Sequence, residues 1–243
     1  MAENTTEQTL VLIKPDALKN SLTGYILSML SEYHTGLIFA ALKVVSVNKM
    51  LASEHYAEHK DKAFFPELLK YIAGQIHYPD EPIKRRVIAI VYQGEGAIQK
   101  IRNIAGNTNP HKARLEKPGC IRAIGTVVPV KDASGNVIDN RIDNLIHASA
   151  NPEDAEREIK LWFKPNEIPP LMQPFPVVES KEHFYFKDGK LLRSYIPVCN
   201  CLVAPGDLVW KTDYEALSTL CEGKRAKITL EAIAAKYLIN TAI

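Results

Sequence analysis

The sequence predicts a mixed α/β fold, because short apolar segments typical of β-strands alternate with segments of helical periodicity. Residues 8–13 form the first apolar run, which predicts a buried strand that delivers Lys14 at its carboxyl end. Apolar residues then recur at helical spacing over residues 17–33, and Gly36 allows a turn into a second expected strand over residues 37–47. A β-α-β unit therefore opens the chain.

The middle of the chain continues this alternation and adds two loops. The expected elements are a helix capped by Asn48, a helix over residues 64–71 closed by Gly74, a strand over 87–92 and a helix over 95–104 that stops at Gly106. Residues 75–86 contain prolines and a basic run, which is loop composition. Residues 107–122 are rich in Asn, Pro and Gly, and a long irregular loop of this kind usually has a task.

A hairpin and a helix are expected next. Residues 127–130 and 137–138 flank the turn sequence Asp132-Ala-Ser-Gly135, which is typical of a β-hairpin. Residues 151–163 begin with an asparagine suited to an N-cap and a proline suited to the first helical position. His147 is therefore expected just before a helix.

A change of composition predicts the domain boundary. Residues 168–176 are rich in proline, which is typical of a linker or an extended strap. Beyond them we expect a hairpin that turns at Asp188-Gly189 and a closing helix over residues 229–240. The predicted division is a domain over residues 1–168 and a C-terminal extension over 169–243, which we interpret as a packing or assembly element. The alternative is a regulatory module.

Composition limits the class of protein. The 243 residues are 46% hydrophobic and 24% charged, which are ordinary values for a globular chain and disfavour a disordered one. A formal net charge of +2 gives no protein-wide field to hold a nucleic-acid backbone, so we expect no nucleic-acid partner. No run approaches a membrane span, and the polar start at residues 1–7 has no signal pattern, so we expect a cytoplasmic protein.

The four cysteines predict no disulfide framework. They are too sparse for one, and a reducing compartment would keep them as thiols. Cys199 and Cys201 could bind a metal, but a single pair without a second His or Cys pair at zinc spacing is a poor ligand set. We therefore interpret the cysteines as structural thiols and predict no metal site made by the protein alone.

His147 is the candidate nucleophile. A histidine that attacks phosphorus must be neutral, and one ring nitrogen must be held by an acceptor so that the other presents its lone pair. Glu158, in the helix that follows, and Ser149 are candidates for that role. The alternative is a structural histidine beside a solvated helix face.

Phosphate transfer also needs fixed positive charge, because phosphate oxygens gain charge in the transition state. The candidates are Lys14, Arg102 and Arg122, from a strand end, a helix and the long loop. A lone arginine is usually a solvated surface residue, so these side chains matter only if they converge. The chain has no Walker loop, which excludes the most common nucleotide-binding solution.

Several sequence motifs, taken in order, resemble those of nucleoside diphosphate kinases over roughly residues 8–168. They are Thr9-Leu-Val-Leu-Ile-Lys-Pro-Asp16, His55-Tyr56 through Lys60-Asp-Lys-Ala-Phe-Phe65, Gly106-Asn-Thr-Asn-Pro110, Pro118-Gly-Cys-Ile-Arg122 and Asn144-Leu-Ile-His-Ala-Ser149. The resemblance implies a ferredoxin-like antiparallel sheet covered by helices, here with insertions and a C-terminal extension. It also implies an enzyme that transfers the γ-phosphate of a nucleoside triphosphate to a nucleoside diphosphate by a ping-pong mechanism.

The resemblance implies a role for each matching residue. His147 would be phosphorylated, Glu158 and Ser149 would orient and assist it, and Phe64 would stack on the base. The residues that would contact the phosphates and sugar are Lys14, Tyr56, Arg102, Thr108, Arg122 and Asn144. Mg²⁺ would arrive with the nucleotide, held mainly by its phosphates and water. Family members assemble through dimers into tetramers or hexamers, so we expect a homo-oligomer.

The chain departs from the family pattern in three places. Ala148 and Ala150 stand where the family usually has Gly and Asp, which predicts reduced optimisation of the site and no loss of activity. Insertions near residues 75–86 and 125–142 leave the candidate site residues in place but can alter subunit packing. Together with the extension, they leave open the alternative of a catalytically silent nucleotide-binding scaffold of the same family.

Overall fold

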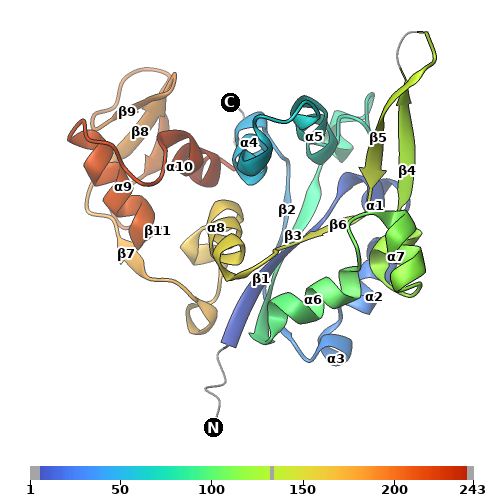
Figure 1. The fold of residues 1–243 in the computed structure, drawn as a ribbon. Coiled ribbons are helices and arrows are strands. Elements are labelled where there is room, and N and C mark those ends of the chain that lie inside the picture. The colour runs from blue at the N-terminus through green and yellow to red at the C-terminus, as the bar shows by residue number, and fades with distance from the viewer. Residues whose placement is uncertain (1–5, 132–133, 240–243) are drawn as a thin grey trace. The chain divides into compact units, whose positions relative to one another are not determined.

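The computed structural model describes residues 6–131 and 134–239 (Figure 1). The chain folds into two compact units. The first unit contains residues 1–44 and 74–155, and the second contains residues 45–73 and 156–243. Within the described ranges, no helix combines the length and apolar character that crossing a membrane requires. This division does not coincide with the expected boundary after residue 168, because residues 45–73 pack with the carboxyl-terminal part of the chain. That boundary stays a prediction.

The first unit is built on a four-stranded sheet with the strand order β2-β3-β1-β6 (Figure 1). Its strands are β1 (Thr6–Ile13), β2 (Ile38–Val45), β3 (Val87–Glu95) and β6 (Ile146–Ala148). The central strand β1 runs antiparallel to both β3 and β6. Helices separate β1 from β2, β2 from β3 and β3 from β6. The predicted ferredoxin-like antiparallel sheet with covering helices is confirmed.

The expected single helix over residues 17–33 is wrong. The chain forms three short helices instead: α1 (Pro15–Lys19), α2 (Thr23–Met29) and α3 (Glu32–Thr35). Ser21 adopts a left-handed backbone conformation with φ of 57°, which ends the first helical segment. Ser31 then starts a new one, because its side chain accepts a hydrogen bond from the backbone N–H of His34.

One face of the sheet packs against α2 and against α6 (Ala97–Ala105) in an apolar core. Val11 and Ile13 lie two residues apart on β1 and so point to the same face. They pack with Ile26 and Leu30 from the α2 region and with Ile101 from α6, and all five are fully buried. This core fixes the strand end at which Lys14 emerges.

The long segment after α6 is more regular than predicted. Residues 107–122 were expected to be irregular, but they contain α7 (Pro110–Glu116) and the start of a 3₁₀ helix at Ile121–Ile124. The sequence signal for α7 was present, because the Asn109 side chain caps it by accepting hydrogen bonds from the N–H groups of His111 and Lys112.

The loop and the hairpin expected in the two insertions are confirmed. Residues 75–86 form a loop that contains one 3₁₀ turn, Pro82–Lys84. The expected hairpin is formed by β4 (Thr126–Lys131) and β5 (Val137–Asp143), which pair antiparallel. Asp132 and Ala133 of its predicted turn lie outside the described residues.

The second unit contains α4 (Lys49–His55), a 3₁₀ turn at Ala57–His59, α5 (Phe65–Ile72) and most of α8 (Pro152–Trp162).

Both predicted asparagine caps, at the starts of α4 and α8, are confirmed. The Asn48 side chain accepts from Leu51 N at 2.8 Å, and the Asn151 side chain accepts from Asp154 N at 2.8 Å.

Over residues 169–239, the extension forms a 3₁₀ turn at Pro170–Met172, two small sheets and two α-helices. The elements are β7 (Val177–Glu179), β8 (Phe184–Lys187), β9 (Lys190–Leu192), β10 (Asn200–Val203), β11 (Leu208–Trp210), α9 (Lys211–Cys221) and α10 (Leu230–Tyr237). The predicted β8–β9 hairpin is confirmed, and Asp188 and Gly189 both adopt positive φ at its turn. The predicted closing helix corresponds to α10, but it ends at Tyr237 and so does not reach the expected end at Asn240, which itself lies outside the described residues.

The extension shares its apolar core with α4. Met50 of α4 packs against a cluster of buried side chains from β8, β10, β11, α9 and α10. Beside this cluster, Lys236 Nζ lies 2.6 Å from Asp213 Oδ1, and Tyr237 donates to Asp213 Oδ2 at 3.3 Å. Burial lowers the pKa of Lys236, and the Asp213 carboxylate opposes that shift. The Asp213 carboxylate therefore compensates the buried positive charge of Lys236.

We predict that Asp213→Ala destabilises the protein by about 3–5 kcal/mol, because it leaves the buried ammonium of Lys236 without its carboxylate. Urea unfolding of the full chain measures the change. Glu215→Ala is the matched control on the same helix: its ion pair with Lys211 is exposed, so it should cost less than about 1 kcal/mol. Equal effects of the two substitutions would contradict the structural importance of the buried pair.

Candidate active site

Strand β6 holds His147 beside the central strand of the first unit. His147 pairs with Leu12 in the antiparallel ladder between β6 and β1. Two further bonds extend this pairing: Ser149 N donates to Leu10 O at 3.2 Å, and Leu10 N donates to the Ser149 hydroxyl at 3.1 Å. Ser149 is fully buried, so its side chain fixes the backbone immediately after His147.

The backbone just before His147 is strained. Leu145 has a φ of 71°, a left-handed conformation that is rare for a side chain of this size. Its carbonyl accepts from Lys14 N at 2.9 Å, and its N–H donates to the buried carboxylate of Asp16 at 2.8 Å. These bonds hold residues 144–146 in the turn that brings the chain onto β1.

Lys14, Asn144 and Thr108 are brought together by side-chain hydrogen bonds. Lys14 Nζ donates to the Asn144 side-chain oxygen, and Asn144 Nδ2 donates to the carbonyl of Thr108 at 2.8 Å. Lys14 and Asn144 are buried, whereas Thr108 is exposed. Three candidate residues that are far apart in the sequence therefore lie at one place in the first unit.

The environment of Lys14 lowers its pKa to about 8. Burial is the main cause, because it disfavours the charged ammonium, and the nearby Arg122 guanidinium acts in the same direction. The carboxylates of Asp16 and Asp143 oppose the shift. Lys14 is thus charged at neutral pH but close enough to its pKa to lose that charge under mildly alkaline conditions.

Arg122 links the loop after α6 to β6. It is buried, and its guanidinium donates to Gly106 O at 2.9 Å and to Ile146 O at 3.2 Å. Arg102 is exposed on α6, whose carboxyl end leads into the same loop. Within residues 6–131 and 134–239, no hydrogen bond or ion pair joins the Arg102 side chain to Lys14, Asn144 or Arg122.

Tyr56 and Phe64 belong to the second unit, where His59 lies between them. The rings of Tyr56 and His59 are stacked with centroids 6.2 Å apart, and the rings of His59 and Phe64 are 5.6 Å apart. Phe64 is 45% exposed, which is high for an aromatic ring and leaves part of its face accessible. Sequence reasoning did not identify His59.

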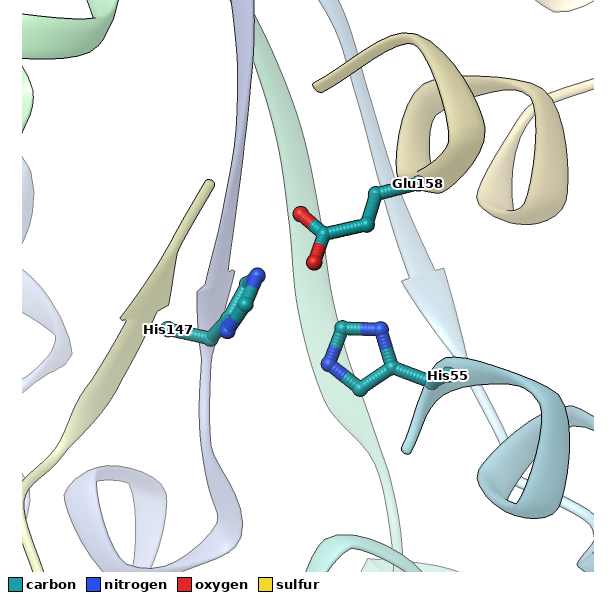
Figure 2. A group of neighbouring side chains, drawn as sticks. All are labelled: His55, His147 and Glu158. Atoms are coloured by element: carbon teal, nitrogen blue, oxygen red, sulfur yellow. The ribbon is translucent and has the colours of Figure 1, made fainter. Parts of the chain in front are cut away.

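Glu158 lies on α8 of the second unit near His55. Figure 2 shows the His55 side chain extending from α4, the Glu158 side chain from α8 and the His147 imidazole from β6. Glu158 is buried, and ligand atoms of Glu158 and His55 lie within 4.8 Å of each other. Trp162 Nε1 donates to His55 Nδ1 at 3.1 Å, so a neutral His55 carries its proton on Nε2.

A network beside Asn144 was also missed. Asp143 Oδ2 lies 3.0 Å from His77 Nε2, and the Arg141 guanidinium donates to both oxygens of Asp143 at 2.8 and 3.1 Å. Asp143 could have been predicted as part of the site from the sequence, because it directly precedes the candidate residue Asn144. His77 lies in the first insertion and carries no such signal.

Comparisons with known proteins identify the family of the chain. A family model described as nucleoside diphosphate kinase matches residues 7–168. The chain is 35% identical over 202 residues to a nucleoside diphosphate kinase of Thermococcus kodakarensis, covering 83% of this chain and 99% of that protein.

Two solved structures show the same likeness. A nucleoside diphosphate kinase of Aquifex aeolicus superposes with a TM-score of 0.53 at 32% identity, over 68% of this chain and all of that one. A halophilic one from Halobacterium salinarum, in complex with CDP, gives 0.52 at 32% identity, over 68% of this chain and 92% of that one. The chain belongs to the nucleoside diphosphate kinase family.

Proposed function

We propose that the chain is an active nucleoside diphosphate kinase that transfers the γ-phosphate of a nucleoside triphosphate to a nucleoside diphosphate through phosphorylated His147. The observation that carries the proposal is the convergence of Lys14, Asn144, Thr108 and Arg122 next to the strand that holds His147. Positive charge and hydrogen-bond donors at that place suit the phosphates of a nucleotide.

In the first half-reaction, a ring nitrogen of neutral His147 attacks the γ-phosphorus. The bond from that phosphorus to the bridging oxygen breaks, and the nucleoside diphosphate leaves with the bond's electron pair. The second half-reaction reverses these steps with another diphosphate. We assign Lys14 and Arg122 to the neutralisation of phosphate oxygens, and Glu158 and Ser149 to the orientation of the imidazole.

The remaining site residues are assigned to nucleotide binding. Phe64 would stack on the base, Tyr56 would assist at the phosphates, and Arg102, Thr108 and Asn144 would contact phosphate or sugar. Stacking reads no base edge, so we expect weak preference among bases. The CDP bound by the Halobacterium salinarum relative supports this class of ligand.

We propose that Mg²⁺ binds together with the nucleotide. Lys14, Arg122 and the Asn144 amide suit phosphate, and the nearby carboxylates of Asp16 and Asp143 already accept hydrogen bonds from Leu145 N–H and from His77 and Arg141. The nucleotide phosphates and water would therefore hold the ion, which would neutralise phosphate charge when bound. A cytoplasmic location and a homo-oligomer built from dimers stay predictions.

Transfer of label tests the function. The protein is mixed with γ-labelled ATP and Mg²⁺, freed of nucleotide and given GDP; we expect acid-labile label on the protein that then moves to GDP. His147→Ala should lower transfer by at least about 10³-fold, whereas the exposed histidine variant His34→Ala should not. ATP binding without label would favour the silent scaffold, and full transfer by His147→Ala would exclude the proposed nucleophile.

The pKa of Lys14 predicts how activity depends on pH. As pH rises through about 8, Lys14 loses its charge and its attraction for phosphate, so kcat/KM should fall. Lys14→Arg should weaken this alkaline fall, because arginine stays charged. Lys100→Arg, an exposed control on α6, should keep the wild-type profile. An unchanged alkaline fall in Lys14→Arg would assign the titration to another group.

Phe64→Ala is predicted to weaken nucleotide binding by about 1–3 kcal/mol, or roughly 5- to 150-fold in KM, through the loss of base stacking. The factor should be similar for purine and pyrimidine substrates. Steady-state assays with four diphosphates measure it. Tyr33→Ala removes another exposed aromatic ring and should leave KM unchanged; a KM that is also unchanged in Phe64→Ala would contradict the stacking role.

A further inference from the structure

His77, Asp143 and Arg141 form a hydrogen-bonded network in the first unit, centred on the buried carboxylate of Asp143. The side chains of His77 and Asp143 are only 8% and 9% exposed, and Arg141 holds both carboxylate oxygens. Burial alone would raise the pKa of Asp143, but the bonds from His77 and Arg141 outweigh it and lower that pKa. Asp143 is therefore negatively charged across the neutral pH range.

The backbone of Asp143 is tightly placed. Asp143 pairs with Thr126 at the base of the β4–β5 hairpin, and a Cβ added at Gly125 would lie 2.5 Å from the Asp143 carbonyl oxygen. The next residue is Asn144, whose side chain bonds to Lys14 and to the carbonyl of Thr108. A shift of Asp143 would therefore move the partner of Lys14.

The first insertion also braces the helix that begins after Lys14. Lys19, at the end of α1, lies 5.1 Å from the ring centre of Tyr78 and 3.9 Å from the carboxylate of Glu81. Arg85 donates to the carbonyl of Tyr78 at 2.8 Å, which closes the loop on itself. The insertion thus contacts the chain on both sides of the Lys14–Asn144 pair, through Lys19 and through Asp143.

We propose that His77, Asp143 and Arg141 are positioning residues that hold Asn144 in place and keep Lys14 positively charged for a nucleotide phosphate. The charged groups that act on Lys14 are Asp16 and Asp143, which favour the ammonium, and Arg122, which disfavours it. The proposal rests on the proposed function, because only a phosphate ligand gives the charge on Lys14 a role. It assigns both insertions to the support of the site. The first insertion supplies His77, the second supplies Arg141, and Asp143 directly follows the second.

The charge on Lys14 is measured directly by NMR titration of lysine side chains labelled with ¹³C, with the Lys14 signal assigned through Lys14→Arg. Asp143→Asn, which keeps the shape but removes the charge, should lower the Lys14 midpoint, because it removes one of the two carboxylates that favour the ammonium. Asp143→Ser should shift it in the same direction, and Asp143→Glu should restore it. Glu95→Gln, an exposed control on β3, should not change it.

Circular dichroism verifies that each variant is folded, and a folded Asp143→Asn or Asp143→Ser protein with an unchanged Lys14 midpoint overturns the proposal. In turnover assays, the alkaline limb of kcat/KM should move to lower pH by the same amount, which a purely structural role would not produce. If the wild-type protein transfers no phosphate but the Lys14 midpoint still shifts, the network stands and the proposed function fails.

Discussion

The antiparallel pairing of β6 with β1 is the constraint on which the rest of the site depends. It places His147 opposite Leu12, two residues before Lys14, although 135 residues separate Leu12 from His147 in the sequence. The strained turn at Leu145 is part of this constraint, since Asp16 and Lys14 both bond to its backbone. A residue in so rare a conformation persists only where its surroundings determine it, and here they also carry the candidate phosphate-binding groups.

Electrostatics around Lys14 follow from the same arrangement. Burial disfavours the ammonium, and the neighbouring Arg122 adds to that effect, yet two cations close together are what a polyphosphate ligand requires. The carboxylates of Asp16 and Asp143 favour the charged form of Lys14 and so offset part of that cost. The positive charge that would receive an anion is thus stabilised by two nearby carboxylates, one bonded to Leu145 N–H and the other to His77 and Arg141.

Local rules in the sequence predicted much of the fold. Asn48 and Asn151 cap their helices and Asp188-Gly189 turns its hairpin, because each signal acts within a few residues. Helical periodicity over residues 17–33 failed because the backbone adopts a left-handed conformation at Ser21 and a new helix is capped by Ser31. The site motifs were visible in the sequence, but the contact between His77 and Asp143 spans 66 positions and depends on how an insertion folds. No local pattern contains that information.

A crystal structure with GDP and Mg²⁺ bound tests most directly whether the β1–β6 junction builds a phosphate-binding site. The account predicts that the diphosphate contacts Lys14, Thr108 and Arg122, that the base lies on Phe64, and that the terminal phosphate is directed at a ring nitrogen of His147. A nucleotide bound elsewhere on the chain, or with its phosphates away from Lys14 and Arg122, would contradict it.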